Sequence, residues 1–189
     1  TVRNLGSGTN SYVLEELKTT AKLDCSKLYT ATSTDNGIFT TSTPFANGAS
    51  LAVVEGNNFI GTFTMGSNQI NVSTTKLINN AEIGFSFTSS LKTLPIDATV
   101  TGGPLTGEPR AITRVNLDLI STLSVSVNAI PLIIQGVTDT VTSSEMVFNS
   151  FTGKKEFRLL GYSRDPRVEI TQTAPLDLQI NGMIVEVAF

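Results

Sequence analysis

Short stretches in which apolar and polar residues alternate one by one are the feature that most limits the fold of this chain. In Glu82–Phe87 every second residue is apolar, and Arg114–Leu119 repeats the pattern. A period of two places one set of side chains on each face of a β-strand. Turn residues separate such stretches about every eight to twelve positions, a spacing typical of sandwiches and barrels. We therefore predict an all-β protein with two antiparallel β lobes of sandwich or barrel type.

The same pattern places individual strands and turns. Hairpin tips are expected at Asn57-Asn58 and at Gly66-Ser67-Asn68, and another turn at Asp35-Asn36-Gly37. The expected strands are Lys22–Tyr29, Ser50–Val54, Asn58–Thr64, Gln69–Ser73, Glu82–Thr88, Arg114–Leu119, Val125–Val127, Ile130–Ile134, Val147–Phe151, Phe157–Leu160, Val168–Ile170 and Leu176–Val187.

One short helix and one boundary between lobes complete the expected architecture. The helix is predicted over Tyr12–Thr20, where acidic residues come early, Lys18 comes late and three apolar residues can share a face. The boundary is predicted at residues 97–110, which include five glycines and prolines and few large apolar residues. We expect an N-terminal β lobe at 1–96, a Gly/Pro linker at 97–110 and a C-terminal β-sandwich lobe at 111–189.

The composition excludes several kinds of enzyme. The chain has no histidine and a single cysteine, Cys25. Without an imidazole there is no Ser-His-Asp or Cys-His relay and no histidine-based zinc or iron site. One cysteine cannot form a disulfide within the chain or a Cys-x-x-Cys metal knuckle. We predict no catalytic residue, no cofactor site, no metal site and no enzymatic activity.

The remaining candidates for chemistry also have simpler interpretations. Two carboxylates can run a glycosidase. Glu15-Glu16 is expected on a solvated helix face, however, and Asp165 with Glu169 is expected in surface or interface ion pairs. Cys25 is expected to be a buried, inert thiol. Lysine nucleophiles would have to come from residues with no motif around them, which are Lys76, Lys92, Lys154 and Lys155.

Charge and hydropathy limit the partners. The net charge is −3 and no basic stripe is visible, so tight binding to DNA or RNA is not expected. Leu119–Thr138 is uncharged, but serines, Asn128 and Pro131 interrupt it and its apolar residues alternate, so we predict no membrane span. The chain starts at Thr1 without methionine, which is expected for a processed product or an excised segment.

An ordered set of segments carries a family resemblance. The segments are Leu14–Glu16 followed by Leu23–Ser26, then Ile83–Pro95, Arg110–Val115, Gly161–Ile170 and Ala174–Val187. Together they resemble the C-terminal region of the tail nozzle proteins of short-tailed bacteriophages, the podoviruses, also called tail tubular protein B. The individual motifs are short, so the resemblance depends on their order along nearly all of the chain.

The resemblance implies a structural role in the virion. Family members form a hexameric ring beneath the portal and the tail adaptor protein, contact tail fibre proteins, and line the channel for DNA ejection. They are several times longer than this chain. The resemblance thus implies a homo-oligomer in the phage tail, made in the bacterial cytoplasm, with phage DNA passing non-specifically and with no cofactor.

Five arginines are candidates for ion pairs across subunits of such a ring: Arg110, Arg114, Arg158, Arg164 and Arg167. They could equally balance acidic residues within one lobe, and the sequence favours neither interpretation. Two other functions stay open. A carbohydrate- or receptor-binding module of a phage fibre or adhesin would need exposed aromatic side chains. A histidine-free glycosidase would need two carboxylates facing each other across a cleft.

Overall fold

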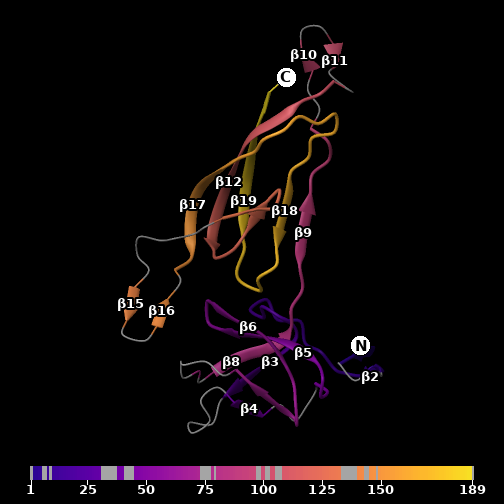
Figure 1. The fold of residues 1–189 in the computed structure, drawn as a ribbon, viewed down its shortest axis with the longest axis vertical. Coiled ribbons are helices and arrows are strands. Elements are labelled where there is room, and N and C mark those ends of the chain that lie inside the picture. Colours follow the sequence, from indigo (N-terminus) through magenta and orange to yellow (C-terminus); the bar gives the residue numbers. More distant parts are fainter. Residues whose placement is uncertain are drawn as a thin grey trace. The chain divides into compact units, whose positions relative to one another are not determined.

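The computed structural model shows an all-β protein (Figure 1). Its described residues are 2–5, 8, 10–30, 38–40, 45–72, 78, 80–96, 99–100, 103–104, 108–132, 140–142, 145–147 and 149–188. Within these ranges the strands are all paired in antiparallel sheets and no helix occurs. The predicted all-β class is therefore confirmed. The expected turn at Asp35-Asn36-Gly37 and Lys76 lie outside the described residues.

Contacts divide the chain into two compact units. The first unit comprises Thr1–Phe87, Thr138–Phe148 and Ala174–Leu176. The second comprises Thr88–Val137, Asn149–Thr173 and Asp177–Phe189. This division differs from the expected linker at 97–110, because the chain enters the second unit at Thr88 and part of the expected linker forms a small hairpin. In that hairpin β10 (Thr99–Val100) pairs with β11 (Gly103–Pro104).

The first unit is built around a four-stranded antiparallel sheet. Its strand order is β3 (Asp24–Thr30), β8 (Asn80–Phe85), β5 (Ser50–Glu55) and β6 (Asn58–Thr64). Three two-stranded pairs complete the unit: β1 (Val2–Asn4) with β2 (Asn10–Tyr12), β4 (Ile38–Thr40) with β7 (Gln69–Asn71), and β15 (Thr140–Thr142) with β16 (Glu145–Val147). The β5–β6 hairpin turns at Gly56-Asn57, next to the predicted position.

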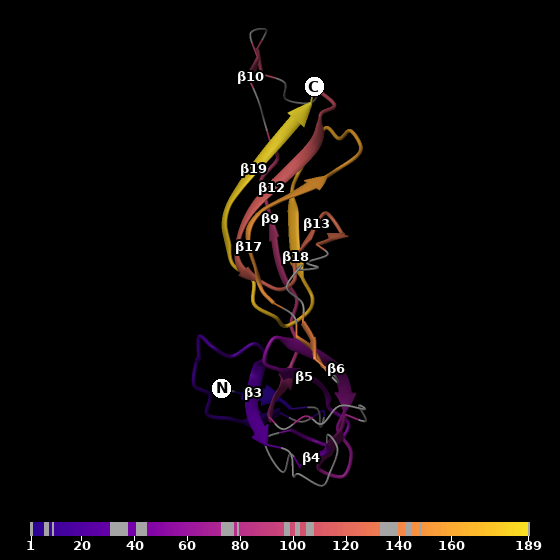
Figure 2. The same ribbon diagram turned by 90° about the vertical axis from the view of Figure 1, so that its left-hand side faces the viewer.

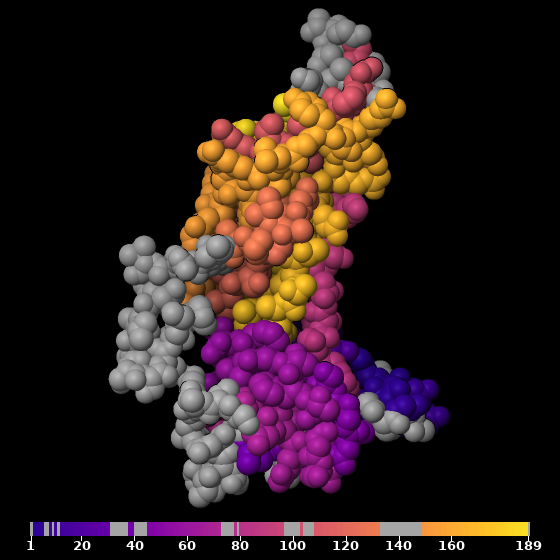
Figure 3. All heavy atoms as spheres, in the orientation of Figure 1, coloured from indigo at the N-terminus to yellow at the C-terminus, as the bar shows by residue number. Residues whose placement is uncertain are grey.

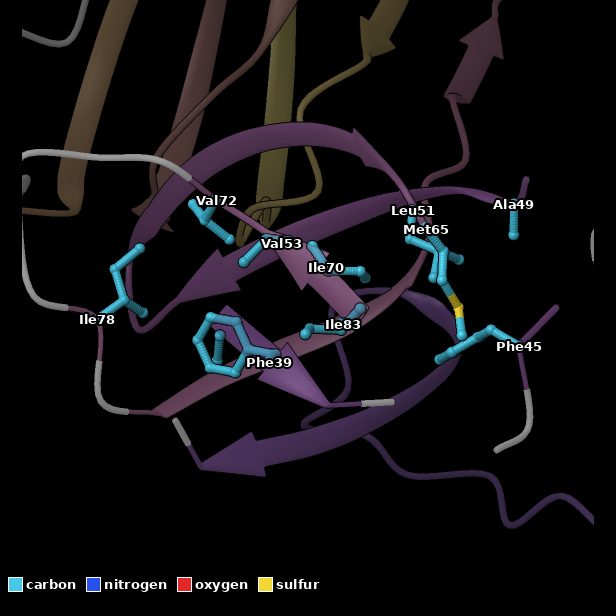
Figure 4. Packing of buried hydrophobic residues seen from close by; sticks show 11 residues of the cluster. Phe39, Phe45, Ala49, Leu51, Val53, Met65, Ile70, Val72, Ile78 and Ile83 are labelled. Atoms are coloured by element: carbon cyan, nitrogen blue, oxygen red, sulfur yellow. The ribbon is translucent and has the colours of Figure 1, made fainter. Parts of the chain in front are cut away.

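Apolar side chains from both the sheet and the β4–β7 pair form the first unit's core. Figure 4 shows Phe39, Ile70 and Ile83 in the middle of this cluster. All three are fully buried. Phe45 meets Phe85 edge-on, with 5.6 Å between the ring centroids. Burying such large side chains is the main favourable contribution to folding, so this unit has a core of its own.

Besides the β10–β11 hairpin, the described part of the second unit contains two antiparallel sheets (Figure 2). One has the order β17 (Phe151–Arg158), β12 (Ala111–Thr122) and β19 (Ile180–Ala188). The other has the order β14 (Ile130–Pro131), β13 (Ser126–Val127), β18 (Glu169–Gln172) and β9 (Ser89–Lys92). A single buried cluster takes members from both sheets, including Val115, Leu117 and Leu119 of β12 and Ile170 of β18. The predicted alternation in 114–119 is confirmed, since these three β12 residues are fully buried.

The predicted helix over Tyr12–Thr20 is wrong. Tyr12 ends strand β2, residues 13–18 have no regular structure, and residues 19–20 form a turn. The apolar face that should have stabilised a helix has nothing to pack against, because Leu14 and Leu17 are 102% and 98% exposed. A helix this short is marginal in water without such packing. An ion pair between Arg3 and Glu15, with Nε 2.6 Å from Oε1, holds the segment in place instead.

Candidate functional site

Arg110 lies inside the second unit and not on its surface. It is 2% exposed and immediately precedes β12. Its Nη1 donates to the carbonyl oxygen of Ile96 at 2.8 Å, and its Nη2 donates to that of Arg164 at 3.2 Å. Its backbone exchanges two hydrogen bonds of 2.8 Å with Ser163. Arg110 therefore ties three separate segments of its own chain together, and its guanidinium is not placed to meet another subunit.

Arg114 and Arg158 lie on the outward face of the three-stranded sheet. They are directly opposite each other in the β12–β17 register, and Glu186 of β19 is opposite Arg114 on the other side. Arg114 Nε is 3.6 Å from Glu186 Oε2 and 3.9 Å from Glu156 Oε1, and Arg158 Nε is 2.8 Å from Glu156 Oε1. The ion pairs link the four side chains into a row whose charges alternate, from Arg158 through Glu156 and Arg114 to Glu186.

A hydrogen bond shifts the pKa values of two members of this row, Glu156 and Arg158. The bond from Arg158 lowers the pKa of the Glu156 carboxyl below its ordinary value, and the charge of Arg114 acts in the same direction. The same bond raises the pKa of Arg158. Glu156 is thus ionised and Arg158 protonated at neutral pH, and their charges cancel. Such a surface neither concentrates nor repels phosphate strongly.

Arg164 and Arg167 lie in the loop between β17 and β18. Arg167 Nη2 is 2.7 Å from Asp165 Oδ2, an ion pair within one turn. Arg164 is exposed, and none of the described residues forms an ion pair with its side chain. Of the five predicted arginines, the structure brings Arg114 and Arg158 together, gives Arg167 a local partner, leaves the Arg164 side chain at the surface and buries Arg110.

A groove of about 770 Å³, with polar and apolar lining in similar amounts, runs along this loop beside Glu169 and Thr171 of β18. Its walls carry two ion pairs, Arg167 with Asp165 and Lys92 with Glu169, the latter 3.6 Å from Nζ to Oε2. Tyr162, which is 69% exposed, lies on its lining. Asp165 and Glu169, predicted in surface or interface ion pairs, are each held by a cation here.

Sequence reasoning did not identify this groove. Lys92 and Glu169 come from strands far apart in the sequence, and only the β9–β18 pairing brings them opposite each other. The available signal was the loop Gly161–Pro166, where a glycine and a proline enclose exposed polar residues and Tyr162. Loops of this composition on a rigid β framework commonly hold binding residues.

The other candidate residues occupy ordinary structural positions. Cys25 is half-buried in β3, and burial raises the pKa of its thiol. Glu16 Oε2 is 3.5 Å from Lys18 Nζ. Lys155 Nζ lies 4.8 Å from the centre of the Phe151 ring, a cation–π contact, and Lys154 is exposed. These surroundings activate none of the described groups as a nucleophile.

Two further features are absent from the residues that the structure describes. No group of three or more acidic or cysteine side chains is placed to hold a metal ion. The described residues form no helix that is long and apolar enough to cross a bilayer.

A comparison of the sequence with protein-family models finds no match, and a comparison with curated proteins finds none either.

Proposed function

We propose that this chain is part of a structural virion protein, the nozzle ring of a short-tailed bacteriophage through which DNA is ejected. The observation that carries the proposal is that segments of the family resemblance pair with one another in the second unit. Strand β9, from the segment Ile83–Pro95, pairs with β18, from Gly161–Ile170. Beyond β9, the Thr93 amide donates to the Val168 carbonyl at 2.9 Å. Motifs that are far apart in sequence thus form one connected element.

The buried Arg110 extends the same element. It belongs to the segment Arg110–Val115, and it bonds the carbonyl of Ile96 on one side and that of Arg164 on the other. A motif set whose members contact one another is easier to explain as a shared fold than as chance similarity. We therefore extend the proposal to a sandwich- or barrel-like lobe that serves as a stiff wall element.

Charge distribution supports a channel wall that DNA can pass. On the outward face of the three-stranded sheet, Arg114 and Arg158 alternate with Glu156 and Glu186. Phosphate binding requires an excess of cations that displaces counterions, and this face has none. The proposed partners are further copies in a hexameric ring, the tail adaptor and tail fibre proteins, and DNA passing without sequence preference. The proposed location is the phage tail.

Electron cryo-microscopy of the protein encoded by the whole reading frame tests the proposal. Six-fold rings are expected, and a monomer or a ring of another symmetry at micromolar concentration would contradict it. Surface arginines are expected at the contacts between copies, so the double variant Arg164→Glu, Arg167→Glu should reduce ring formation. Lys27→Glu, an exposed reversal in the first unit, is the matched control and should leave the rings intact.

Carbohydrate binding is a second candidate, which the groove along the Gly161–Pro166 loop favours. Tyr162 offers an exposed aromatic face, and the two ion pairs offer donors and acceptors for sugar hydroxyl groups. A glycan array probed with the isolated chain would show saturable binding that Tyr162→Ala removes. Equal signals for the chain and for Tyr162→Ala would exclude the groove as a saccharide site.

A further inference from the structure

A short segment of the first unit exposes its leucines almost completely. Leu14 and Leu17 are 102% and 98% exposed, and Tyr12 just before them is 90% exposed. The segment has no regular structure over residues 13–18. Large apolar side chains scattered singly over a surface are ordinary. Three of them within six residues form a patch that is typical of a contact surface.

The second unit has an apolar groove beside an open strand edge. The groove has a volume of about 380 Å³, and its apolar lining comes from Leu91, Ile170, Leu178, Ile180 and Met183. In the part of the chain that the structure describes, β9 and β19 are each the outer strand of their sheet. Figure 3 shows the residues of β9, in magenta, at the surface beside the yellow residues near the C-terminus. An outer strand offers backbone N–H and C=O groups for pairing with a further strand.

The exposed segment and the β9 edge match residue by residue. Leu14-Glu15-Glu16-Leu17 has leucines three positions apart, and so does Leu91-Lys92-Thr93-Leu94. Leu91 is 58% exposed and Leu94 is 83% exposed. If the two segments pair antiparallel with Leu17 opposite Leu91, then Leu14 is opposite Leu94. The same register places Glu16 opposite Lys92.

Each of these three pairs is favourable. Residues three apart in a strand point to opposite faces, so Leu17 and Leu91 together face the groove while Leu14 and Leu94 cover each other outside. Glu16 and Lys92 have opposite charge. Among the described residues, the ion-pair partner of each is weak and exposed, Lys18 at 3.5 Å for Glu16 and Glu169 at 3.6 Å for Lys92. Facing pairs of opposite charge and of apolar side chains stabilise neighbouring strands.

We propose that Leu14–Leu17 of one copy adds as an antiparallel strand to β9 of a second copy, with Leu17 in the apolar groove. This is strand addition to an open sheet edge, in which backbone bonds supply affinity and side-chain pockets supply register. The donor and acceptor surfaces differ, so the contact is heterologous, and repetition of a heterologous contact can close a ring. The inference names a contact for the proposed ring and rests on that function.

Sedimentation velocity of the 189-residue chain over a range of concentrations tests the contact. We expect reversible association, weakened about tenfold or more by Leu17→Ser, because a fully buried leucine contributes at least that much to affinity. Glu16→Lys and Lys92→Glu should each weaken association several-fold, and the double reversal should restore it. Leu160→Ser changes an equally exposed leucine, at 101%, and should leave association unchanged.

A mixing experiment tests the register and shows that the contact is between copies. Chains carrying Cys25→Ser with Leu14→Cys are mixed with chains carrying Cys25→Ser with Leu94→Cys under mild oxidation. A disulfide-linked heterodimer is expected, because facing residues of paired strands lie within disulfide reach. Leu160→Cys in place of Leu94→Cys should give little of it.

The outcomes separate this contact from the function it serves. A monomer at all concentrations, or association unaffected by Leu17→Ser, would overturn the strand addition. Six-fold rings of the whole protein that persist with Leu17→Ser would overturn it too, while leaving the proposed nozzle function standing. Failure of the whole protein to form rings would instead count against that function.

Discussion

Arg110 and Ile96 are joined by a hydrogen bond of 2.8 Å from a guanidinium that is 2% exposed. Ile96 lies just past the β9 edge, and its amide donates to the Pro166 carbonyl at 3.0 Å. Together the two bonds link the start of β12, the residues that follow β9 and the loop after β17. A buried guanidinium in this position holds the three segments together by donating to their carbonyl oxygens.

Replacing Arg110 should loosen this end of the second unit. Arg110→Ala leaves the carbonyls of Ile96 and Arg164 without their donor and creates a cavity, so we expect a loss of about 3 kcal/mol in the local free energy of opening. Hydrogen exchange read by NMR should show the amides of Ile96 and Ser163 exchanging about 100-fold faster. Arg164→Ala changes only an exposed side chain and should have little effect. Unchanged protection of Ile96 in Arg110→Ala would contradict this role.

The strands could be predicted where local pattern and burial agree. Asn58–Thr64 has the predicted bounds, and β12 follows the alternation of Arg114–Leu119. Half-buried strands carry their own signal because successive side chains face core and solvent in turn. The expected strand Glu82–Thr88 is found as Asn80–Phe85, so it begins two residues earlier and ends three residues earlier. Boundaries shift in this way because they depend on where a partner strand ends.

Features that depend on partners far along the chain could not be predicted. Strand β9 reads Ser-Ser-Leu-Lys and has no alternation, yet it pairs fully with β18. Arg110 looks like the other arginines in sequence, and its burial depends on partners far along the chain, among them the carbonyls of Ile96 and Arg164. The predicted helix failed for the opposite reason, since its local signals had no tertiary surface to pack on.

The Glu156–Arg158 pair predicts a dependence on pH. The pKa of Glu156 is lower in the folded chain than in the unfolded one because Arg158 donates to its carboxylate. The pair therefore stabilises the fold above the unfolded carboxyl pKa of about 4.3, and this contribution disappears as pH falls through the lower, folded value. A carbon-13 NMR titration of the Glu156 carboxyl should give a midpoint below the ordinary range, and Arg158→Gln should return it toward that range. Equal midpoints in both proteins would show that the bond is absent in solution.

Cys25 should be a slow nucleophile. Burial raises the pKa of its thiol, with Glu15 acting in the same direction, so the thiolate fraction at neutral pH is below that of a free cysteine. Alkylation by iodoacetamide should be slower in the folded chain than in urea, with a midpoint above about pH 8.5. A midpoint at or below that pH would indicate an activated thiol and revive a chemical role for this residue.

Gly84 should tolerate no side chain, because the backbone of the neighbouring strand β3 comes very close to this position of β8. A Cβ built on Gly84 would lie 2.8 Å from both the Asp24 carbonyl oxygen and the Ser26 Cβ, and 2.9 Å from the Ser26 Cα. Relief would require moving the β3 backbone, so Gly84→Ala should destabilise the first unit by about 3 kcal/mol and lower its Tm by several degrees. Gly66→Ala in the same unit is the matched control, because a Cβ there meets no atom within 4 Å. Circular dichroism during heating compares the two variants. Equal Tm values would contradict the close approach of β3 to β8. They would also show that the bulge in β3 between Asp24 and Lys27 does not depend on a glycine opposite it.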